Sequence, residues 1–209
     1  MGINRLFLHR CYLIGPMDHD RIGGREWRED IADFLISRGV IPFDPYNKPI
    51  HKLHMEGLED DDAFEERKIA TERKDWAEVR RIMKPIVAID LRMVDNVDFT
   101  IVNLDVDSKP CGTYDEIFMA ASQNKPVIIM CPQGKSAISP WMYGRLPNEL
   151  FFESWDEVRS YIDHINSDEK IDLLDRWKFF DIEDTVRKII KEKDSKNFDD
   201  VSSGLLQTR

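Results

Sequence analysis

The stretch 99–131, FTIVNLDVDSKPCGTYDEIFMAASQNKPVIIMC, carries a strand, a helix and a second strand in succession. Phe99–Leu104 and Pro126–Cys131 are short and mostly apolar, as parallel strands buried on both faces are. Between them, Thr113–Gln123 repeats its apolar residues at helical spacing, which predicts a helix with one buried face. Two apolar strands joined by a helix indicate a parallel strand–helix–strand unit.

The alternation of strands and helices continues on both sides of this unit. The further predicted elements are strands at Leu6–Ile14 and Val40–Phe43, and helices at Arg25–Ser37 and Ser154–Ile165. Ser154 provides the N-cap of the last helix. We therefore expect a flavodoxin/Rossmann-like three-layer α/β sandwich, with a mostly parallel five-stranded sheet and helices on both faces.

A charged insert at 47–84 interrupts this alternation. Asp60–Asp62 are expected to cap a helix that ends near Met83, and Pro85 to begin a new unit with a short helix at Ile86–Val97. A further helix is expected at Ile171–Ile190. We predict one domain over residues 1–190, followed by a polar and flexible tail at 191–209.

Composition excludes several classes of protein. The formal net charge of −10 argues against stable binding of nucleic acid, which requires basic surfaces. No apolar run approaches the ~18 residues of a membrane span, so a cytoplasmic protein without a membrane partner is expected. The three cysteines lack CxxC spacing, which fits free thiols in a reducing compartment. The five histidines show no ligand motif, so neither a metal nor a cofactor is expected.

Two carboxylates stand out as candidates for catalysis. Ligands of open α/β sheets bind beyond the carboxyl ends of the strands, and Glu116 lies near the start of a helix that follows such an end. The alternative role of Glu116 is to complement the helix dipole. Asp90 lies in an otherwise apolar segment, where it could also be a helix cap or a surface acid. Paired carboxylates around a sugar carbon suit glycosidic cleavage.

Other residues allow both a functional and a structural interpretation. Asp98 precedes a buried strand and could be a structural hydrogen-bond acceptor, and Asp105 could bind a sugar hydroxyl or belong to a solvated turn. Gly23-Gly24-Arg25 could hold a phosphate or form a plain turn. Tyr12 and Trp141 could stack on a base or belong to the core.

Several of these pieces occur together in an order that resembles the nucleoside 2-deoxyribosyltransferase family, over roughly residues 5–135. The similar segments are Tyr12-Leu13-Ile14-Gly15-Pro16, Asp90–Val102 with its aspartates Asp90, Asp95 and Asp98, Gly112–Ala120 around Glu116, and Lys125–Ile129.

The resemblance implies a role for each of these segments. Glu116 would attack C1′ of a 2′-deoxyribonucleoside and form a covalent deoxyribosyl-enzyme, and Asp90 would handle the proton of the departing base. A second base would then take the sugar.

The family forms oligomers in which a neighbour helps to complete the site, so the expected partners are nucleosides or nucleotides, nucleobases and further copies of the chain. The substrate-binding residues expected from the fold and the resemblance are Tyr12, Gly15, Pro16, Met17, Asp44, Asp98, Asp105, Gly112 and Thr113.

The chain also departs from the family pattern. Pro110 occupies a position where many members carry a sugar-orienting aspartate, and Ile117 and Phe118 replace smaller residues, which predicts a bulkier pocket wall. Related nucleotide N-glycosidases cleave nucleoside 5′-monophosphates, and 21–25 resembles their phosphate loop, so this hydrolase is the alternative function. A non-catalytic nucleotide-binding protein of the same fold is a third possibility.

Overall fold

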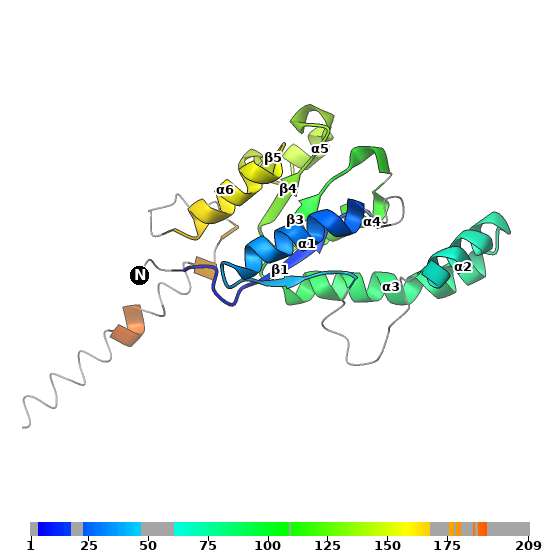
Figure 1. Ribbon diagram of the computed structural model, residues 1–209, viewed down its shortest axis with the longest axis horizontal. Helices are drawn as coiled ribbons and strands as arrows, with labels where there is room; N and C mark the ends of the chain where they lie inside the picture. Colours follow the sequence, from blue (N-terminus) through cyan, green and yellow to red (C-terminus); the bar gives the residue numbers. More distant parts are fainter. Residues whose placement is uncertain are drawn as a thin grey trace, which may run out of the picture. The chain divides into compact units, whose positions relative to one another are not determined.

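The computed structural model describes residues 4–17, 23–46, 61–108, 110–167, 176–177, 179–180, 186 and 188–191. The chain divides into two compact units, Met1–Ile171 and Asp172–Arg209. The first unit contains every strand of the sheet (Figure 1). In the second unit the rings of Trp177 and Phe180 stack with their centroids 5.4 Å apart. Most of the helix expected at 171–190 lies outside the described residues, as does the tail beyond 191.

The sheet has five parallel strands in the order β2-β1-β3-β4-β5. The strands are β1 Arg10–Ile14, β2 Ile41–Phe43, β3 Phe99–Asn103, β4 Val127–Met130 and β5 Phe151–Phe152. This is the flavodoxin-like order. The next two strands in the sequence lie on opposite sides of β1, with β2 on one side and β3 on the other. The fold expected from the sequence is confirmed. In such a sheet the ligand crevice opens beside the carboxyl ends of β1 and β3.

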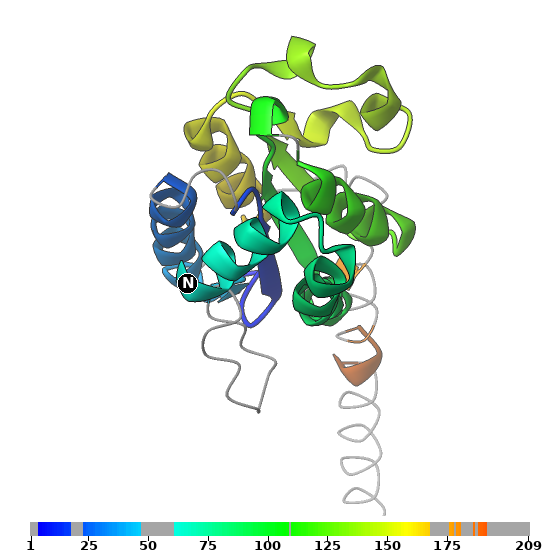
Figure 2. The ribbon, with the colours of Figure 1, turned by 90° about the vertical axis from the view of Figure 1, so that its right-hand side faces the viewer.

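Helices cover both faces of the sheet (Figure 2). They are α1 Gly23–Ile36, α2 Asp61–Glu72, α3 Trp76–Asn96, α4 Cys111–Ser122, α5 Pro140–Tyr143 and α6 Trp155–Ile165, with short 3-10 turns at η1 Val106–Ser108, η2 Lys135–Ala137 and η3 Asn148–Leu150. On one face α1 and α6 lie together, and Trp27 stacks on Trp155 with ring centroids 5.0 Å apart. On the other face α3 packs beside α4. None of the described helices is long and apolar enough to cross a membrane.

The core between the sheet and the pair α3–α4 places β1 side chains against α4. Alternate residues of a strand point to the same face, so Tyr12 and Ile14 of β1 join Met93 of α3 and Ile117 of α4 in one buried cluster. Burying one aliphatic side chain of this size stabilises the fold by about 1.5–3 kcal/mol. This packing brings the Tyr12 ring to the inner surface of α4.

The helix boundaries in the insert differ from those expected. One helix was predicted to end near Met83 with Pro85 beginning the next, but α2 ends at Glu72 and α3 runs from Trp76 through Pro85. The break falls at Asp75, whose side chain caps α3 by accepting from the Glu78 N–H at 3.1 Å. Apolar residues continue at helical spacing across Pro85, with Ile82, Ile86, Ile89 and Met93 all buried. Their burial outweighs the loss of one backbone hydrogen bond at the proline.

The remaining differences are small. The expected cap of α6 is confirmed, because Ser154 Oγ accepts from the Glu157 N–H at 3.3 Å. The strand β5 was not located in advance, although a fifth strand was expected. It has two residues and pairs with β4 through Ile129 and Phe151, so it is too short to show an alternating pattern.

Candidate active site

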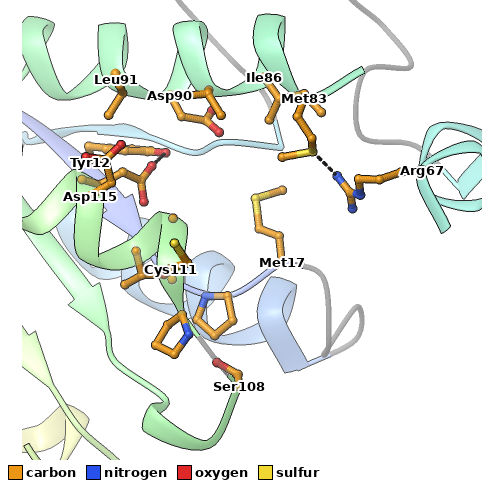
Figure 3. A pocket seen from close by; sticks show the side chains of 17 residues that line it. Tyr12, Met17, Arg67, Met83, Ile86, Asp90, Leu91, Ser108, Cys111 and Asp115 are labelled. Carbon is orange, nitrogen blue, oxygen red and sulfur yellow. Dashed lines mark hydrogen bonds between the residues drawn. The ribbon is translucent and has the colours of Figure 1, made fainter. Parts of the chain in front are cut away.

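A pocket of about 590 Å³ lies at the carboxyl edge of β1, between the loop that follows β1, the start of α4 and the helices α2 and α3 (Figure 3). Its lining comprises Tyr12, Gly15, Pro16, Met17, Arg67, Met83, Ile86, Val87, Asp90, Leu91, Ser108, Pro110, Cys111, Gly112, Thr113, Asp115 and Glu116. The position is that expected for a ligand site in a doubly wound sheet. A cavity of this volume accommodates a small molecule.

Glu116 lies in the wall of this pocket with its carboxylate held by Tyr12. The Tyr12 hydroxyl donates to Glu116 Oε1 at 2.6 Å. Tyr12 is 1% exposed and Glu116 8% exposed, so the bond is almost entirely removed from water. Charge-assisted bonds of this kind are stronger than neutral ones, and the bond therefore fixes the orientation of the carboxylate.

The electrostatics of Tyr12 keep it in the donor form. Burial raises the pKa of the Tyr12 phenol well above its usual value of 10.0, and the negative charges of Glu116 and Asp90 raise it further. The phenol therefore stays protonated at neutral pH and donates to Glu116 rather than competing with it for a proton. An oriented carboxylate facing a pocket can act as a nucleophile or as a base.

Asp90 is the second carboxylate of the pocket and comes from α3. Residues Met83, Ile86, Val87, Asp90 and Leu91 line the pocket from this helix, and their spacing places them on one helix face. Asp90 is half-buried and is the charged member of this otherwise apolar stripe. In Figure 3 its carboxylate points from α3 into the pocket, on the same side as Tyr12.

The loop after β1 forms the lip of the pocket. Gly15, Pro16 and Met17 line the cavity directly. Behind them the fully buried Arg28 of α1 donates to the carbonyl of Gly15 at 2.8 Å. At the other side, an added Cβ at Gly112 would meet nothing within 4 Å, so the space beside the first turn of α4 is open.

The structure brings eight of the residues expected from the sequence to this pocket. They are Tyr12, Gly15, Pro16, Met17, Asp90, Gly112, Thr113 and Glu116.

Three predicted aspartates do not line the pocket. Asp98 precedes β3 at the amino edge of the sheet, opposite to the pocket, and accepts from the Arg10 N–H at 2.7 Å. Asp44 accepts from the Tyr46 N–H at 3.0 Å. Asp105 accepts from Gln133 Nε2 at 2.6 Å. Each of the three carboxylates binds a neighbouring polar group, and Asp98 has the structural role that its position before the strand had allowed.

The structure also locates the residues at which this chain departs from the family pattern. Pro110 is buried in the pocket wall and is the N-cap residue of α4, where it provides no side-chain cap hydrogen bond. The expectation of a bulkier wall at Ile117 and Phe118 is wrong, because Ile117 belongs to the core, Phe118 packs against that core, and neither lines the pocket. Trp141 is 70% exposed, so it belongs neither to the core nor to the pocket.

The sequence did not indicate which residues of the insert reach the pocket. Arg67 of α2 reaches the pocket, and its Nη1 donates to Met83 Sδ at 3.5 Å. In Figure 3 Arg67 and Tyr12 lie at opposite ends of the cavity. The pattern at 86–91 could have revealed the α3 stripe, whereas nothing in the sequence indicated how α2 folds onto it. Among the described residues, no group of three or more His, Cys, Asp or Glu side chains could hold a metal ion.

Among the solved structures that this chain resembles are three enzymes, each at 16% identity. The 2-deoxyribosyltransferase of Bacillus psychrosaccharolyticus matches with a TM-score of 0.48, covering 78% of this chain and 99% of that one. The CMP N-glycosidase BcmB of Clostridium botulinum matches with a TM-score of 0.43, covering 75% and 98%. The 2-deoxyribosyltransferase of Leishmania mexicana matches with a TM-score of 0.41, covering 75% and 98%. No family model matches the chain, and the comparison with curated proteins found no match.

Proposed function

We propose that this chain is a nucleoside 2-deoxyribosyltransferase, which cleaves the N-glycosidic bond of a 2′-deoxyribonucleoside and transfers the sugar to another base. The observation that carries the proposal is the buried hydrogen bond between Tyr12 and Glu116 at the wall of the pocket. A carboxylate that is held in one orientation and largely shielded from water is suited to attack an electron-poor carbon. Asp90 supplies a second carboxyl group from another wall of the same cavity.

The first half-reaction forms a bond between a Glu116 oxygen and C1′ of the sugar. The bond from C1′ to the base nitrogen breaks, and its electron pair leaves with the base. Asp90 transfers the proton that neutralises the departing base. The apolar stripe of α3 beside Asp90 offers a surface on which a flat base can lie.

The second half-reaction regenerates Glu116. An incoming base, deprotonated by the same carboxyl group, attacks C1′ and displaces the Glu116 carboxylate. Two displacements at one carbon retain its configuration. If water attacks in place of the base, the reaction is hydrolysis, so the outcome depends on how well the pocket excludes water.

One observation favours a second candidate, the hydrolysis of 2′-deoxynucleoside 5′-monophosphates. Arg67 lines the pocket from α2, and a guanidinium group is well matched to phosphate. In this candidate Glu116 and Asp90 keep their roles, while Arg67 binds the 5′-phosphate. Of the phosphate loop expected at 21–25, residues 21 and 22 lie outside the described residues, while Gly23–Arg25 form the first turn of α1 and do not line the pocket.

A substrate panel distinguishes these candidates. Deoxycytidine, deoxyadenosine and their 5′-monophosphates are incubated with the enzyme, with and without an acceptor base. Exchange of bases on the nucleoside supports the transferase, whereas free base together with deoxyribose 5-phosphate supports the hydrolase. Absence of both reactions contradicts enzymatic function and leaves a binding protein.

Covalent trapping tests the nucleophile itself. A 2′-fluoro-arabino nucleoside should leave its sugar on Glu116, at a position that peptide mass spectrometry identifies. Glu116→Gln should abolish the adduct while the fold is retained. Asp115→Asn is the matched control, because Asp115 is the adjacent pocket carboxylate and is exposed. An adduct on any residue other than Glu116 would refute the assignment.

A further inference from the structure

We propose that Arg28 is a positioning residue which fixes the lip of the pocket, Gly15–Met17, by binding backbone carbonyl groups on both sides of the turn that joins β1 to α1. The inference rests on the proposed function in so far as the lip contacts the substrate. No motif in the sequence had singled out Arg28.

The contacts of Arg28 span the whole turn. Its Nε donates to the carbonyl of Leu13 at 3.3 Å, its Nη2 to that of Gly15 at 2.8 Å, and its Nη1 to that of Gly24 at 2.5 Å. Leu13 belongs to β1, Gly15 to the lip and Gly24 to the first turn of α1. One rigid guanidinium group therefore joins the strand, the lip and the helix.

Glycine makes this close approach possible. A Cβ added to Gly15 would lie 2.9 Å from Trp27 Cζ2, 3.2 Å from the Asn103 carbonyl oxygen and 3.3 Å from Arg28 Nη2. At Gly24 it would lie 3.2 Å from the Pro16 carbonyl oxygen and 3.4 Å from Arg28 Nη1. The lip therefore packs directly against the guanidinium group and its neighbours, and movement of Arg28 must move the lip.

The arrangement is costly, which argues that it serves more than packing. Arg28 is 0% exposed, and a buried charge without a close counter-ion is unfavourable. Among the described residues no carboxylate lies within ion-pair distance of Arg28. Loss of hydration lowers the pKa of its guanidinium group, and the negative charges of the Asp44 and Glu116 carboxylates oppose that shift. A buried aliphatic side chain would avoid this cost but could not hold three carbonyl groups.

Two substitutions separate positioning from general stability. Arg28→Met keeps a side chain of similar length but removes all three hydrogen bonds. Arg28→Lys keeps the positive charge but lacks the planar guanidinium group that donates to several carbonyl groups at once. Arg38→Met is the matched control: Arg38 follows α1, bonds the side chain of Asp163 and lies outside the pocket lining. If Arg28→Met does not fold, Gly15→Ala disturbs the same contact while keeping the arginine.

The readouts are KM and kcat on the nucleoside substrate, and hydrogen–deuterium exchange of the peptide that spans Leu13–Met17. For Arg28→Met we expect kcat/KM to fall roughly 10- to 100-fold, mainly through KM, because a displaced lip misplaces the substrate. Arg28→Lys should fall between Arg28→Met and wild type. Exchange in the lip should rise for both variants, while exchange in β3 and β4 stays as in wild type.

The proposal fails if Arg28→Met, or Gly15→Ala in its place, leaves both KM and lip exchange at wild-type values. It also fails if Arg38→Met, at equal loss of thermal stability, raises KM and lip exchange as much. If wild type turns over neither nucleosides nor monophosphates, the proposed function fails. In that case lip exchange alone decides the role of Arg28.

Discussion

At the scale of single residues, the hydrogen bond from Tyr12 to Glu116 gives the sharpest prediction. Tyr12→Phe removes the donor that orients the carboxylate and leaves Glu116 in a site that is 8% exposed. We expect kcat to fall roughly 10- to 100-fold, the range that follows from the 1.5–3 kcal/mol of a hydrogen bond to a charged group. Steady-state kinetics and the yield of the covalent adduct measure the effect.

Tyr114→Phe is the control for that substitution. Tyr114 precedes Glu116 on α4 by two residues, and its ring stacks on Phe118 rather than facing Glu116. Its loss should leave kcat within about twofold of wild type, since it removes no contact in the pocket. An equal fall of kcat in both variants would show that Tyr12 acts through the packing of α4, and not through its hydroxyl group.

Arg67 gives a prediction about the substrate. If the substrate carries a 5′-phosphate, Arg67→Met should raise KM for the monophosphate by roughly tenfold or more, because a charge-assisted bond to phosphate is lost. KM for the unphosphorylated nucleoside should hardly change. The exposed Arg73, just beyond α2, provides the control Arg73→Met. Equal effects on both substrates would contradict a phosphate contact.

The candidate residues show why only part of a site is readable from sequence. Glu116 and Asp90 could be expected, because a helix that follows a strand end and an acid in an apolar stripe both have a defined geometry. Asp98 and Asp105 lie beside a strand too, but the same argument cannot distinguish a ligand from a hydrogen-bond acceptor for a neighbouring backbone or amide group. The role of Arg28 could not be predicted from the sequence, because its hydrogen-bond partners are backbone carbonyl groups, which every residue has.

At the scale of elements, α3 contains the least expected feature, a proline in its interior. Pro85→Ala restores the donor for the carbonyl of Arg81 and removes a poor helix former. The gain is partly offset by the greater freedom of the unfolded chain. We expect a net rise of about 1 kcal/mol in the free energy of unfolding, measured by urea denaturation.

Lys84→Ala is the control for this substitution, because it changes an exposed neighbour on the same helix. It should alter the free energy of unfolding by no more than about 0.5 kcal/mol. A clear loss of stability in Pro85→Ala would show that α3 depends on the proline for its packing rather than merely tolerating it.

The same helix shows how local signals compete. Pro85 is a strong local signal, and it led to a wrong boundary for α3, whereas the acidic run at Asp60–Asp62 correctly indicated where α2 begins. The apolar residues on either side of the proline form one continuous buried face of α3. The free energy gained by burying this face keeps the helix continuous through Pro85. Sequence therefore located the helical region correctly, but the boundary depended on contacts that only the folded chain makes.

At the scale of the whole molecule, the alternation of apolar strands and amphipathic helices was enough to predict the parallel sandwich. The order of the strands could not be predicted from any single segment of the sequence. It depends on the side of β1 to which each crossover connection carries the next strand. The insert follows β2 and returns the chain to the far side of β1 as β3. That crossover places α3 over the same face as α4 and thereby brings Asp90 toward Glu116.

The burial of Tyr12 and Cys11 in β1 predicts how global stability depends on pH. Burial raises the pKa of the Cys11 thiol well above 9.0 and that of the Tyr12 phenol well above 10.0. In the unfolded chain both groups ionise near those usual values, while the native state keeps them protonated. Well below pH 9 they have no effect on the free energy of unfolding. As the pH rises beyond that, the unfolded state releases protons that the native state retains, so the free energy of unfolding falls.

Tyr12→Phe isolates the contribution of the phenol. Its free energy of unfolding will differ from that of wild type by a constant amount up to about pH 9, and the two curves will converge from about pH 10 upward, because only wild type loses the Tyr12 contribution there. The lowered pKa of Lys125 acts in the opposite direction, but it is common to both proteins and cancels in their difference. Tyr143→Phe, at a tyrosine that is 37% exposed, should change the alkaline slope far less. Urea denaturation between pH 7 and pH 11 measures all three curves, and parallel curves for wild type and Tyr12→Phe throughout that range would contradict a buried and protonated Tyr12.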